Sequence, residues 1–421
     1  MRNIYTALLT IALPIILLRL LWRSLKAPGY RERWQERLGL FKPFDVTNTI
    51  WIHAVSVGEV QAVVPLIKQL QEHHPDQPIV ITTTTPTGSQ RVKELFGDDL
   101  FHVYAPYDLP LIIERFIERA KPRMMVLIET EIWPNLLAIC KQHGIPSLLA
   151  NARLSKRSAT GYARLGKFTR QTFGNITQVA AQAAMDAKHF ADLGVSPDRI
   201  KVTGSIKFDA RLPRSLNEQA EVIRRTWGHD RSVWVAASTH EGEDEQVLDA
   251  HARIRNQIPG TLLVLVPRHP ERFDSAAVLC RKRGLNLVRR SEQKNCTPDT
   301  TVFLGDSIGE LPVFLAGADV AFMGGSLVQH GGHNMLEPAA LGVPVVFGPH
   351  NFNFAAISEL LLEEEAALRV QSAEELSTVV EGWLGDAIER SLVGENGRRV
   401  VEQNRGALQK LVELIEQMLR Q

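Results

Sequence analysis

The sequence has little cysteine and almost no net charge, and both shortages exclude classes of protein. Only three cysteines, Cys140, Cys280 and Cys296, are spread over 421 residues. They are too few and too far apart for a disulfide framework or a tetrahedral zinc site, and they are typical of a reducing compartment. The formal net charge is +1, so we expect no nucleic-acid partner. Apolar residues make up 44%, which is ample for the cores of two globular domains.

A long apolar run occurs at the N-terminus, from Ile4 to Trp22, and it is followed by basic residues. Its length is about the minimum for crossing a bilayer. A cleaved signal peptide would carry its charge before the run, and a buried core helix seldom precedes a basic segment. We therefore expect an uncleaved membrane anchor over residues 1–22, with the main body on the cytoplasmic side. The cationic collar that follows either contacts anionic headgroups or forms a solvated helix.

The rest of the chain alternates short apolar runs with helical patterns, and this alternation starts twice. The runs TIWIHAV, PIVITTTT, FHVYAP, MMVLIET, SLLANAR, VAAQ and IKVTGSIKF are followed, after the linker-like DARLPRSLNEQ, by VWVAAST, LLVLVPRH, LNLVRR, TVFLGD, VAFMGG and VPVVFG. Strands that alternate with helices predict parallel, doubly wound sheets. We expect an α/β protein of two Rossmann-like domains facing across a cleft, residues 23–210 and 211–400, with a helix over 401–421.

The first half places carboxylates directly after its predicted strands, where ligands of such sheets bind. Glu59 falls in the first turn of a helix that begins near Ser56, and Gly58 allows a close approach to the backbone. The helix field favours an ionised carboxylate there, as a general base requires. The alternative is that Ser56 and Glu59 only form a capping box, S-x-x-E. Glu129 and Glu131 follow another strand, either as cleft residues or as a cap and a surface acid.

The second half places cations and flexible turns at the same kind of position. Arg268 directly follows a strand and suits a phosphate, unless it is an ordinary salt-bridged loop residue. The turn at Ile308, Gly309 and Glu310 can host a flat base or simply open a helix. Glycine-rich residues then lead into a helix predicted to begin at about Asn334, whose amides can hold a phosphate, and Glu337 can accept hydrogen bonds from ribose. Histidines 330, 333 and 350 lack compact ligand spacing, so we expect no metal.

These segments together resemble one enzyme family. The segments S-V-G-E, ETEIWPN, NARLS, STHEGE, PRHPERF, GD-x-x-GEL and GGHN-x-LEPA-x-x-G-x-P, in this order behind an apolar N-terminus, closely resemble the 3-deoxy-D-manno-octulosonic acid (Kdo) transferases of lipopolysaccharide assembly. The resemblance covers essentially the whole chain. It implies a GT-B fold, CMP-Kdo as donor, no cofactor, and transfer of Kdo to the lipid A precursor (lipid IVA) at the cytoplasmic side of the cell inner membrane.

The resemblance also implies roles for particular residues. It makes Glu59 the catalytic base of an inverting transfer. It assigns the CMP contacts to the second half, at Pro267, Arg268, Ile308, Gly309, Glu310, Asn334, Met335, Leu336 and Glu337. Arg268 and the turn near Asn334 would neutralise the leaving phosphate without an essential divalent ion. This transfer mechanism requires Glu59 and Arg268 to face each other across the cleft.

Three other interpretations share parts of this pattern. A UDP-sugar transferase or epimerase would keep the fold and change the donor. A catalytically silent GT-B scaffold would bind nucleotide or lipid at the membrane. A dehydrogenase is disfavoured because the first turn is not G-x-G-x-x-G and the second strand ends in TTTTPTGSQR, with no acid for a ribose. The number of Kdo units added is left open by these motifs.

Overall fold

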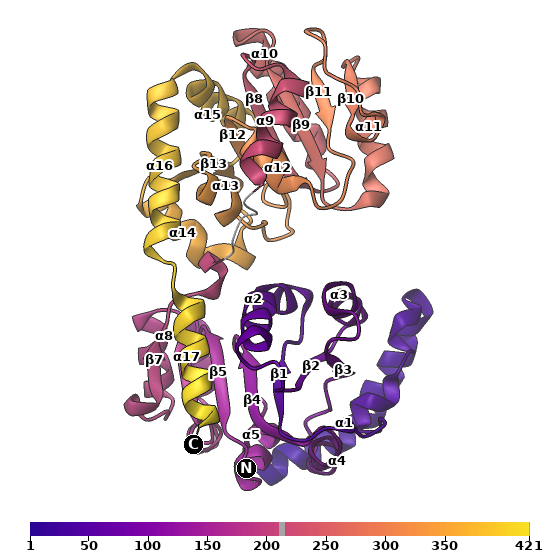
Figure 1. The fold of residues 1–421 in the computed structure, drawn as a ribbon, viewed down its shortest axis with the longest axis vertical. Helices are drawn as coiled ribbons and strands as arrows, with labels where there is room; N and C mark the ends of the chain where they lie inside the picture. The colour runs from indigo at the N-terminus through magenta and orange to yellow at the C-terminus, as the bar shows by residue number, and fades with distance from the viewer. Residues whose placement is uncertain (210–214, 421) are drawn as a thin grey trace. The chain divides into compact units, whose positions relative to one another are not determined.

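The computed structural model describes residues 1–209 and 215–420, which form two compact units. Residues 1–210 and 405–421 make up the first unit, and residues 211–404 make up the second. Part of the linker-like segment expected at 209–219 lies outside the described residues, and its last residues begin helix α9 (Leu216–Trp227). Each unit has its own sheet and its own core, and each is described separately below (Figure 1).

The first unit is built on a seven-stranded sheet whose strands are all parallel. The strands are β1 (Thr49–His53), β2 (Ile79–Thr83), β3 (Phe101–Tyr104), β4 (Pro122–Ile128), β5 (Ser147–Ala152), β6 (Gln178–Ala181) and β7 (Ile200–Val202). Their order is β3-β2-β1-β4-β5-β6-β7. The chain runs outward from β1 in one direction and from β4 in the other, so the topological switch point lies between β1 and β4. Ligands of doubly wound sheets bind at that point.

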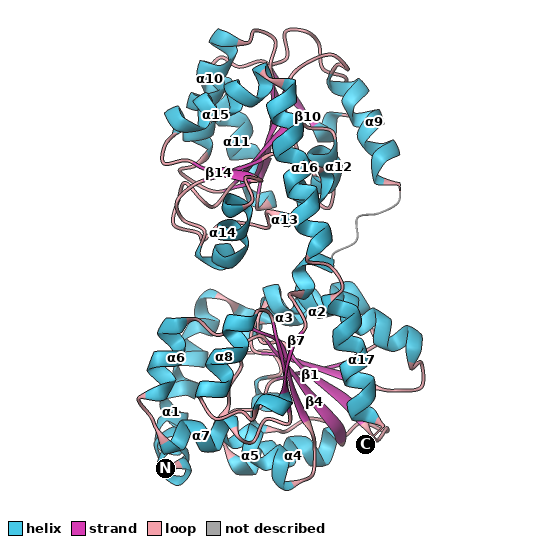
Figure 2. Cartoon of the chain, turned by 90° about the vertical axis from the view of Figure 1, so that its left-hand side faces the viewer, coloured by secondary structure: helices cyan, strands magenta, loops and turns pink. Residues whose placement is uncertain are grey.

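Helices cover both faces of this sheet (Figure 2). They are α1 (Arg2–Lys26), α2 (Val57–His73), α3 (Pro86–Phe96), α4 (Pro110–Ala120), α5 (Pro134–Gln142), α6 (Lys156–Ala163), α7 (Lys167–Phe173), α8 (Ala184–Asp192) and α17 (Ala407–Leu419), with short 3₁₀ turns η1 (Pro28–Tyr30), η2 (Trp34–Leu38), η3 (Pro197–Arg199) and η4 (Ile206–Asp209). Side chains alternate across a strand. Ile50 and Ile52 therefore belong to the cluster with α2 and α17, and Trp51 belongs to the cluster with α4 and α5.

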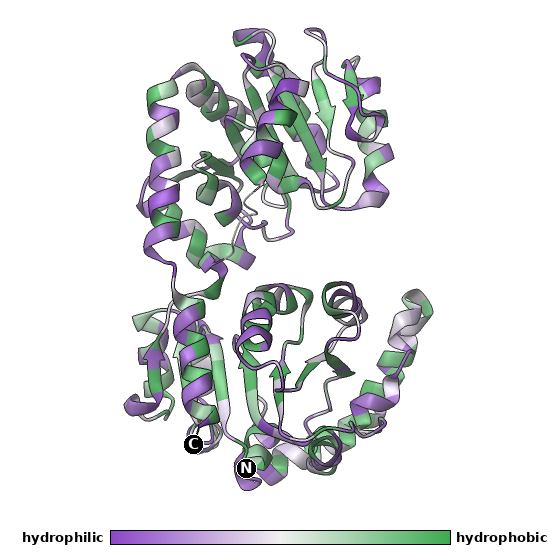
Figure 3. Cartoon of the chain, viewed as in Figure 1, coloured by the Kyte–Doolittle hydropathy of each residue, from purple (hydrophilic) through white to green (hydrophobic). Residues whose placement is uncertain are grey.

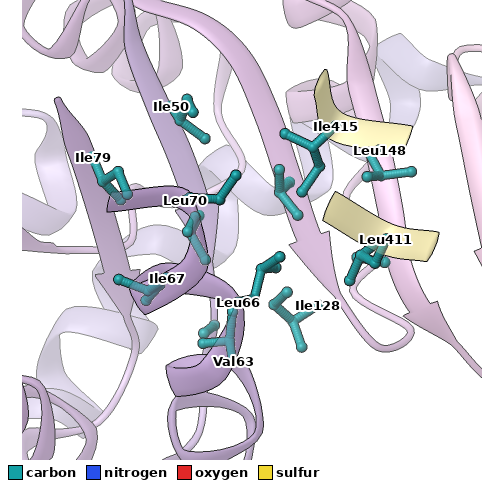
Figure 4. Packing of buried hydrophobic residues seen from close by; sticks show 14 of the residues in the cluster. Ile50, Val63, Leu66, Ile67, Leu70, Ile79, Ile128, Leu148, Leu411 and Ile415 are labelled. Atoms are coloured by element: carbon teal, nitrogen blue, oxygen red, sulfur yellow. The ribbon is translucent and has the colours of Figure 1, made fainter. Parts of the chain in front are cut away.

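The last helix of the chain belongs to the first unit. Leu411 and Ile415 of α17 are buried against Leu66 of α2 and against Leu148 of β5 (Figure 4). The sequence RRVVEQNRGALQKLVELIEQML predicts one continuous helix, but the structure divides it. Helix α16 ends at Gln403, and Gly406, at φ +97°, is the N-cap of α17. Glycine adopts this left-handed conformation without the strain that a side chain would add.

The second unit repeats the architecture with a second all-parallel sheet. Its strands are β8 (Val233–Thr239), β9 (Leu262–Pro267), β10 (Leu287–Arg289), β11 (Val302–Leu304), β12 (Val320–Met323), β13 (Val345–Phe347) and β14 (Ala367–Arg369). Their order is β10-β11-β9-β8-β12-β13-β14, so the switch point lies between β8 and β12. The strands are hydrophobic along most of their length, as expected for strands covered on both faces (Figure 3).

The helices of the second unit are mostly short. Besides α9 and α16 (Ala387–Gln403), they are α10 (Asp244–Gln257), α11 (Phe273–Lys282), α12 (Leu311–Ala316), α13 (Leu336–Leu341), α14 (Ala355–Glu363) and α15 (Ala373–Gly385), with 3₁₀ turns η5 (Pro270–Arg272), η6 (Arg290–Glu292) and η7 (Phe352–Phe354). The two doubly wound sheets confirm the predicted fold class of two Rossmann-like domains. The sequence reading missed the short edge strand β14 and helices α6 and α7.

Candidate functional site

In the first unit, Glu59 occupies the first turn of α2, directly after β1. Ser56 is the N-cap, and its Oγ accepts a hydrogen bond from the Glu59 N–H at 3.3 Å. The Glu59 carboxylate accepts one hydrogen bond from the Val55 N–H at 2.7 Å and another from the Ser56 hydroxyl at 2.8 Å. Ser56 therefore caps the helix as the alternative interpretation expected, but the reciprocal bond of Glu59 goes to the Val55 N–H and not to the Ser56 N–H of a standard capping box. Unlike an ordinary capping carboxylate, however, Glu59 is only 8% exposed.

Burial changes the acid strength of Glu59. Desolvation raises the pKa of its carboxyl to about 7, against the lowering effect of the Ser56 and Val55 hydrogen bonds. From the sequence we expected the helix field to keep Glu59 ionised. That expectation considered only what lowers the pKa of the carboxyl and omitted the larger effect of burial, which raises it. A pKa near neutral pH leaves about half of the Glu59 carboxyls ionised at pH 7. That is the range in which a general base works best.

Two further carboxylates lie near Glu59, at the end of the neighbouring strand β4. The charges of Glu131 and Glu129 both contribute to raising the pKa of Glu59. Glu131 accepts a hydrogen bond from the Trp133 indole N–H at 2.7 Å. Glu129 has φ +59° and lies 3.0 Å from Lys207 Nζ of η4. The structure thus brings three acidic side chains and one lysine together at the switch point of this sheet.

Asn151 links β5 to the segment that carries Lys207. It is fully buried at φ +53°, and its side-chain oxygen accepts a hydrogen bond from the Ile206 N–H at 3.2 Å. Its side-chain NH₂ has no hydrogen-bond partner among the described residues. Non-glycine residues with positive φ are costly and gather at functional sites. Glu129 and Asn151 both have this conformation near the ends of the neighbouring strands β4 and β5.

In the second unit, Arg268 follows β9, and Pro267 is the buried last residue of that strand. The Arg268 N–H donates to the Thr239 carbonyl at 3.0 Å, which ties the turn to the end of β8. The Arg268 side chain is exposed, and it forms no ion pair with any residue in the described part of the chain. The salt-bridged alternative is therefore not realised, and the guanidinium is available to an anion.

The predicted base-binding turn follows β11. Ile308 is 81% exposed, and Gly309 has φ +85°. Glu310 is the N-cap of α12, and both of its carboxylate oxygens accept hydrogen bonds from Arg290, at 2.8 to 3.2 Å. An exposed apolar side chain beside a left-handed glycine offers a flat surface with a free backbone. The Glu310 side chain itself is held by Arg290.

The last predicted group lies where the chain enters α13. The Asn334 side chain donates to Glu337 at 3.0 Å and accepts from the Leu336 N–H at 3.2 Å. Met335 and Leu336 are buried, and burial raises the pKa of Glu337, with Arg268 acting in the opposite direction. The helix begins at Leu336, two residues later than predicted, and has only six residues. Its dipole is correspondingly short, which makes the first amides of this helix a weaker phosphate site than the sequence suggests.

The sequence reading did not single out Lys207, His240 or Glu243. Glu243 is fully buried, and its carboxylate accepts hydrogen bonds from the N–H groups of Gly325, Ser326 and Leu327 at 2.6 to 3.0 Å. His240 Nε2 lies 2.8 Å from His333 Nε2. His240 and Glu243 belong to the quoted segment STHEGE. Their position directly after β8 is the feature of the sequence that could have identified them. Throughout residues 1–209 and 215–420, no cluster of three or more His, Cys, Asp or Glu side chains is arranged to hold a metal ion.

These features define a class of protein. Two seven-stranded parallel sheets, each with polar groups gathered at its switch point, form the architecture of a GT-B glycosyltransferase. Solved structures share this fold: a UDP-GlcNAc 2-epimerase from Neisseria meningitidis, bound to UDP-GlcNAc, covers 88% of this chain and 100% of its own, with a TM-score of 0.59 and 14% identity. A likeness at that identity concerns the fold alone.

Sequence comparison identifies the family. Residues 32–210 match the family model described as 3-deoxy-D-manno-octulosonic-acid transferase (kdotransferase). A 3-deoxy-D-manno-octulosonic acid transferase from Haemophilus influenzae is 44% identical over 421 residues, 99% of each chain, and one from Bordetella pertussis is 35% identical over 431 residues, again 99% of each. The chain belongs to the 3-deoxy-D-manno-octulosonic acid transferase family and is a glycosyltransferase. The resemblance expected from the motifs is confirmed.

Proposed function

We propose that the protein transfers Kdo from CMP-Kdo to the lipid A precursor lipid IVA with inversion at the anomeric carbon, and that Glu59 is the general base. The observation that carries this proposal is the buried Glu59 carboxyl with a pKa of about 7, at the switch point of the first sheet. Family membership supports Kdo as the transferred sugar. The base, the acceptor and the stereochemistry are the proposed steps.

The reaction follows from the chemistry of the two units. Glu59 removes the proton from a hydroxyl of the acceptor sugar, and that oxygen attacks the anomeric carbon of Kdo. The bond to CMP breaks on the opposite face, and Arg268 neutralises the charge that develops on the leaving phosphate. Asn334, Met335, Leu336 and Glu337 bind the nucleotide, as do Pro267, Ile308, Gly309 and Glu310.

A transfer assay tests the function directly. Purified full-length protein is incubated with CMP-Kdo and lipid IVA, and the products are weighed by mass spectrometry. The expected product is lipid IVA heavier by one or more Kdo units, and NMR of the new linkage reports inversion. UDP-GlcNAc in place of CMP-Kdo serves as the control donor. Turnover of UDP-GlcNAc without turnover of CMP-Kdo would replace this proposal with the UDP-sugar alternative.

Arg268→Ala is expected to weaken CMP binding about 10- to 100-fold, because a hydrogen bond to a charged group contributes roughly 1.5–3 kcal/mol. Calorimetric titration of the full chain with CMP measures the change. Arg253→Ala is the matched control, since Arg253 lies in the same unit and forms an exposed ion pair with Glu374 at 3.7 Å. Unchanged CMP affinity in the Arg268 variant would remove Arg268 from the phosphate site.

We also propose that α1 attaches the protein to the membrane by lying in its surface. By length and composition, residues 2–25 could cross a bilayer. However, the large exposed apolar side chains of α1 follow one face of the helix at intervals of three and four residues. They are Ile4, Leu8, Ile11, Ile15, Leu18, Leu21, Trp22 and Leu25. Residues of the opposite face, among them 5, 9, 12, 16 and 20, are partly covered. One apolar face turned outward along a helix is typical of interfacial attachment.

Polar contacts hold the start of α1 against the first unit. The Tyr5 hydroxyl donates to Asp108 at 2.9 Å, and the Thr6 hydroxyl donates to Asn135 at 3.0 Å. Asp108 in turn accepts hydrogen bonds from the first N–H groups of α5, including that of Leu136 at 2.7 Å. A helix that crossed the bilayer would carry Tyr5 and Thr6 away from these partners. The contacts therefore favour an N-terminus on the same side of the membrane as the catalytic units, which we place at the cytoplasmic side of the inner membrane.

A cysteine at residue 3 is expected to react with a membrane-impermeant maleimide from the catalytic side of the membrane. Asn3→Cys is combined with Cys296→Ser, because Cys296 is partly exposed and could react as well. Cys140 and Cys280 are buried and are left unchanged. Inside-out membrane vesicles, which expose the cytoplasmic side, are labelled with and without detergent. Asp230→Cys is the control for that side, since Asp230 is fully exposed in the second unit. Labelling of residue 3 only after detergent, with residue 230 labelled before it, would establish a membrane-crossing helix instead.

A further inference from the structure

Four histidine rings gather at the switch point of the second sheet. His240 follows β8, His269 follows β9, and His330 and His333 follow β12. His240 and His330 stack with ring centroids 4.1 Å apart and 13° between their planes. His269 meets His240 edge-on at 5.6 Å. The Nε2 atoms of His240 and His333 are 2.8 Å apart, which is a hydrogen-bond distance, so the N–H of one ring donates a hydrogen bond to the bare nitrogen of the other.

The turn at Gly325 leaves room for the rings of His240 and His333. Gly325 has φ +67°, and a Cβ at this position would lie 3.2 Å from the rings of both His240 and His333. The buried Glu243 carboxylate fixes the same turn through the Gly325 N–H at 2.6 Å and also accepts from the His240 N–H at 3.2 Å. His240 and His333 are therefore packed on a turn that the Glu243 carboxylate holds, and the exposed rings of His269 and His330 lie against His240 at its outer side.

Burial, and then positive neighbours, disfavour the charged forms of His240 and His333. Burial comes first among the causes that lower the pKa of His240 to about 4 and that of His333 to about 3. The other histidines and Arg268 add to the lowering for both rings, and Arg272 adds to it for His240. The carboxylates on the neighbouring elements are already engaged: Glu243 with backbone amides, Glu337 with Asn334, and Asp244 with Arg272. A new anion against the rings would reverse this balance and favour their protonation.

We propose that His240, His269, His330 and His333 form the subsite for the carboxylate of the donor sugar, and that the cluster takes up one proton from solvent when this carboxylate binds. The inference rests on the proposed donor, whose phosphodiester and sugar acid carry two separate negative charges. Arg268 serves the phosphate, and the neighbouring histidines serve the carboxylate. In the neutral pair, one ring donates the Nε2–H···Nε2 hydrogen bond to the other. An added proton gives each of the two rings an Nδ1–H that can donate to the bound carboxylate. A neutral sugar gains nothing from this change, so the cluster selects for a sugar acid.

Proton uptake measured by calorimetry tests the subsite. Freshly prepared CMP-Kdo is titrated into the full chain at pH 7 in two buffers that differ in ionisation enthalpy. Cytidine 5′-methyl phosphate is the reference, because it is a phosphodiester without a carboxylate. We expect CMP-Kdo binding to take up about one proton more than binding of the reference. Because one proton taken up changes affinity about tenfold per pH unit, we also expect affinity for CMP-Kdo, but not for the reference, to rise about 100-fold between pH 8 and pH 6.

Variants separate the subsite from a purely structural role of the rings. His333→Asn, and the milder His330→Asn at an exposed ring, should flatten the pH dependence and reduce the preference for CMP-Kdo over the reference. His350→Asn is the matched control, because in the described structure this ring makes no contact with the other four. Equal proton uptake for both ligands, or an unchanged pH dependence in His333→Asn and His330→Asn, would overturn the inference while leaving the proposed reaction intact. If wild-type protein neither binds nor transfers CMP-Kdo, the proposed function fails together with the inference.

Discussion

Replacement of Glu59 by glutamine is expected to slow Kdo transfer by about 10²- to 10⁴-fold, the usual contribution of a general base. Glutamine has nearly the same size, and its oxygen can still accept the hydrogen bond from the Val55 N–H or the Ser56 hydroxyl. It cannot accept a proton from the acceptor hydroxyl. Single-turnover rates with CMP-Kdo and lipid IVA measure the loss. Calorimetry with CMP should show affinity unchanged within a factor of about two.

The chain contains its own control for this substitution. Ser372 and Glu375 form the same capping arrangement at the start of α15: the Glu375 N–H donates to Ser372 at 3.3 Å, and Glu375 accepts from the Gln371 N–H at 2.8 Å. The corresponding distances at Ser56 and Glu59 are 3.3 and 2.7 Å. Glu375 is exposed, whereas Glu59 is buried. Glu375→Gln therefore removes a similar cap and should leave transfer unaffected. Equal transfer rates in the two variants would show that Glu59 is only a cap.

The same assignment fixes the direction of the pH dependence. Because burial raises the pKa of Glu59 to about 7, the ionised form that can act as a base is lost as the pH falls through that value. The acidic limb of kcat/KM should therefore have a midpoint near pH 7, well above the range of an ordinary glutamate. Ser56→Ala removes a hydrogen bond that stabilises the ionised form, so the limb should move to higher pH. A limb near pH 4.5 in the wild-type enzyme would contradict the buried environment of the base.

The strands could be predicted because both sheets are buried on both faces. Such strands appear as short continuous apolar runs, and Val233–Thr239 coincides with the predicted run. The edge strand Ala367–Arg369 has an exposed central residue and only three residues, so it carries no such signal. The break between α16 and α17 could not be predicted, because it occurs where the chain leaves the second unit and joins the core of the first. The apolar spacing is helical on both sides of Gly406, and only the packing of Leu411 in the first unit distinguishes the two.

The candidate site was predictable wherever a residue directly follows a strand. Glu59, Glu129 and Arg268 were found in this way, because parallel strands present their carboxyl ends at one edge. Lys207 lies more than 70 residues from Glu129 in the sequence, and only the order of β4 to β7 brings it near. The pKa of Glu59 was misjudged for a related reason: burial depends on surrounding elements that a local motif does not contain.

Replacement of Glu243 by alanine is expected to destabilise the second unit by about 3 kcal/mol or more. Its carboxylate accepts hydrogen bonds from four N–H groups, those of His240, Gly325, Ser326 and Leu327, at 2.6 to 3.2 Å. A buried amide left without a partner costs roughly 1–3 kcal/mol. The cavity is lined by these N–H groups, so other protein groups cannot replace the lost acceptors. Urea unfolding of the full chain, followed by hydrogen exchange of peptides from each unit, measures the loss and assigns it to the second unit.

The effect of Glu243→Ala should also reach the histidine cluster, because the turn that carries Gly325 supports the rings of His240 and His333. We expect faster amide exchange at residues 324–327 and a higher KM for CMP-Kdo, while the exchange of peptides from the first unit stays unchanged. Glu241→Ala is the control, since this carboxylate is exposed two residues earlier in the same turn. If both variants unfold at the same urea concentration as the wild type, the buried carboxylate does not hold the turn. The position of the histidines would then have to depend on the glycine conformation alone.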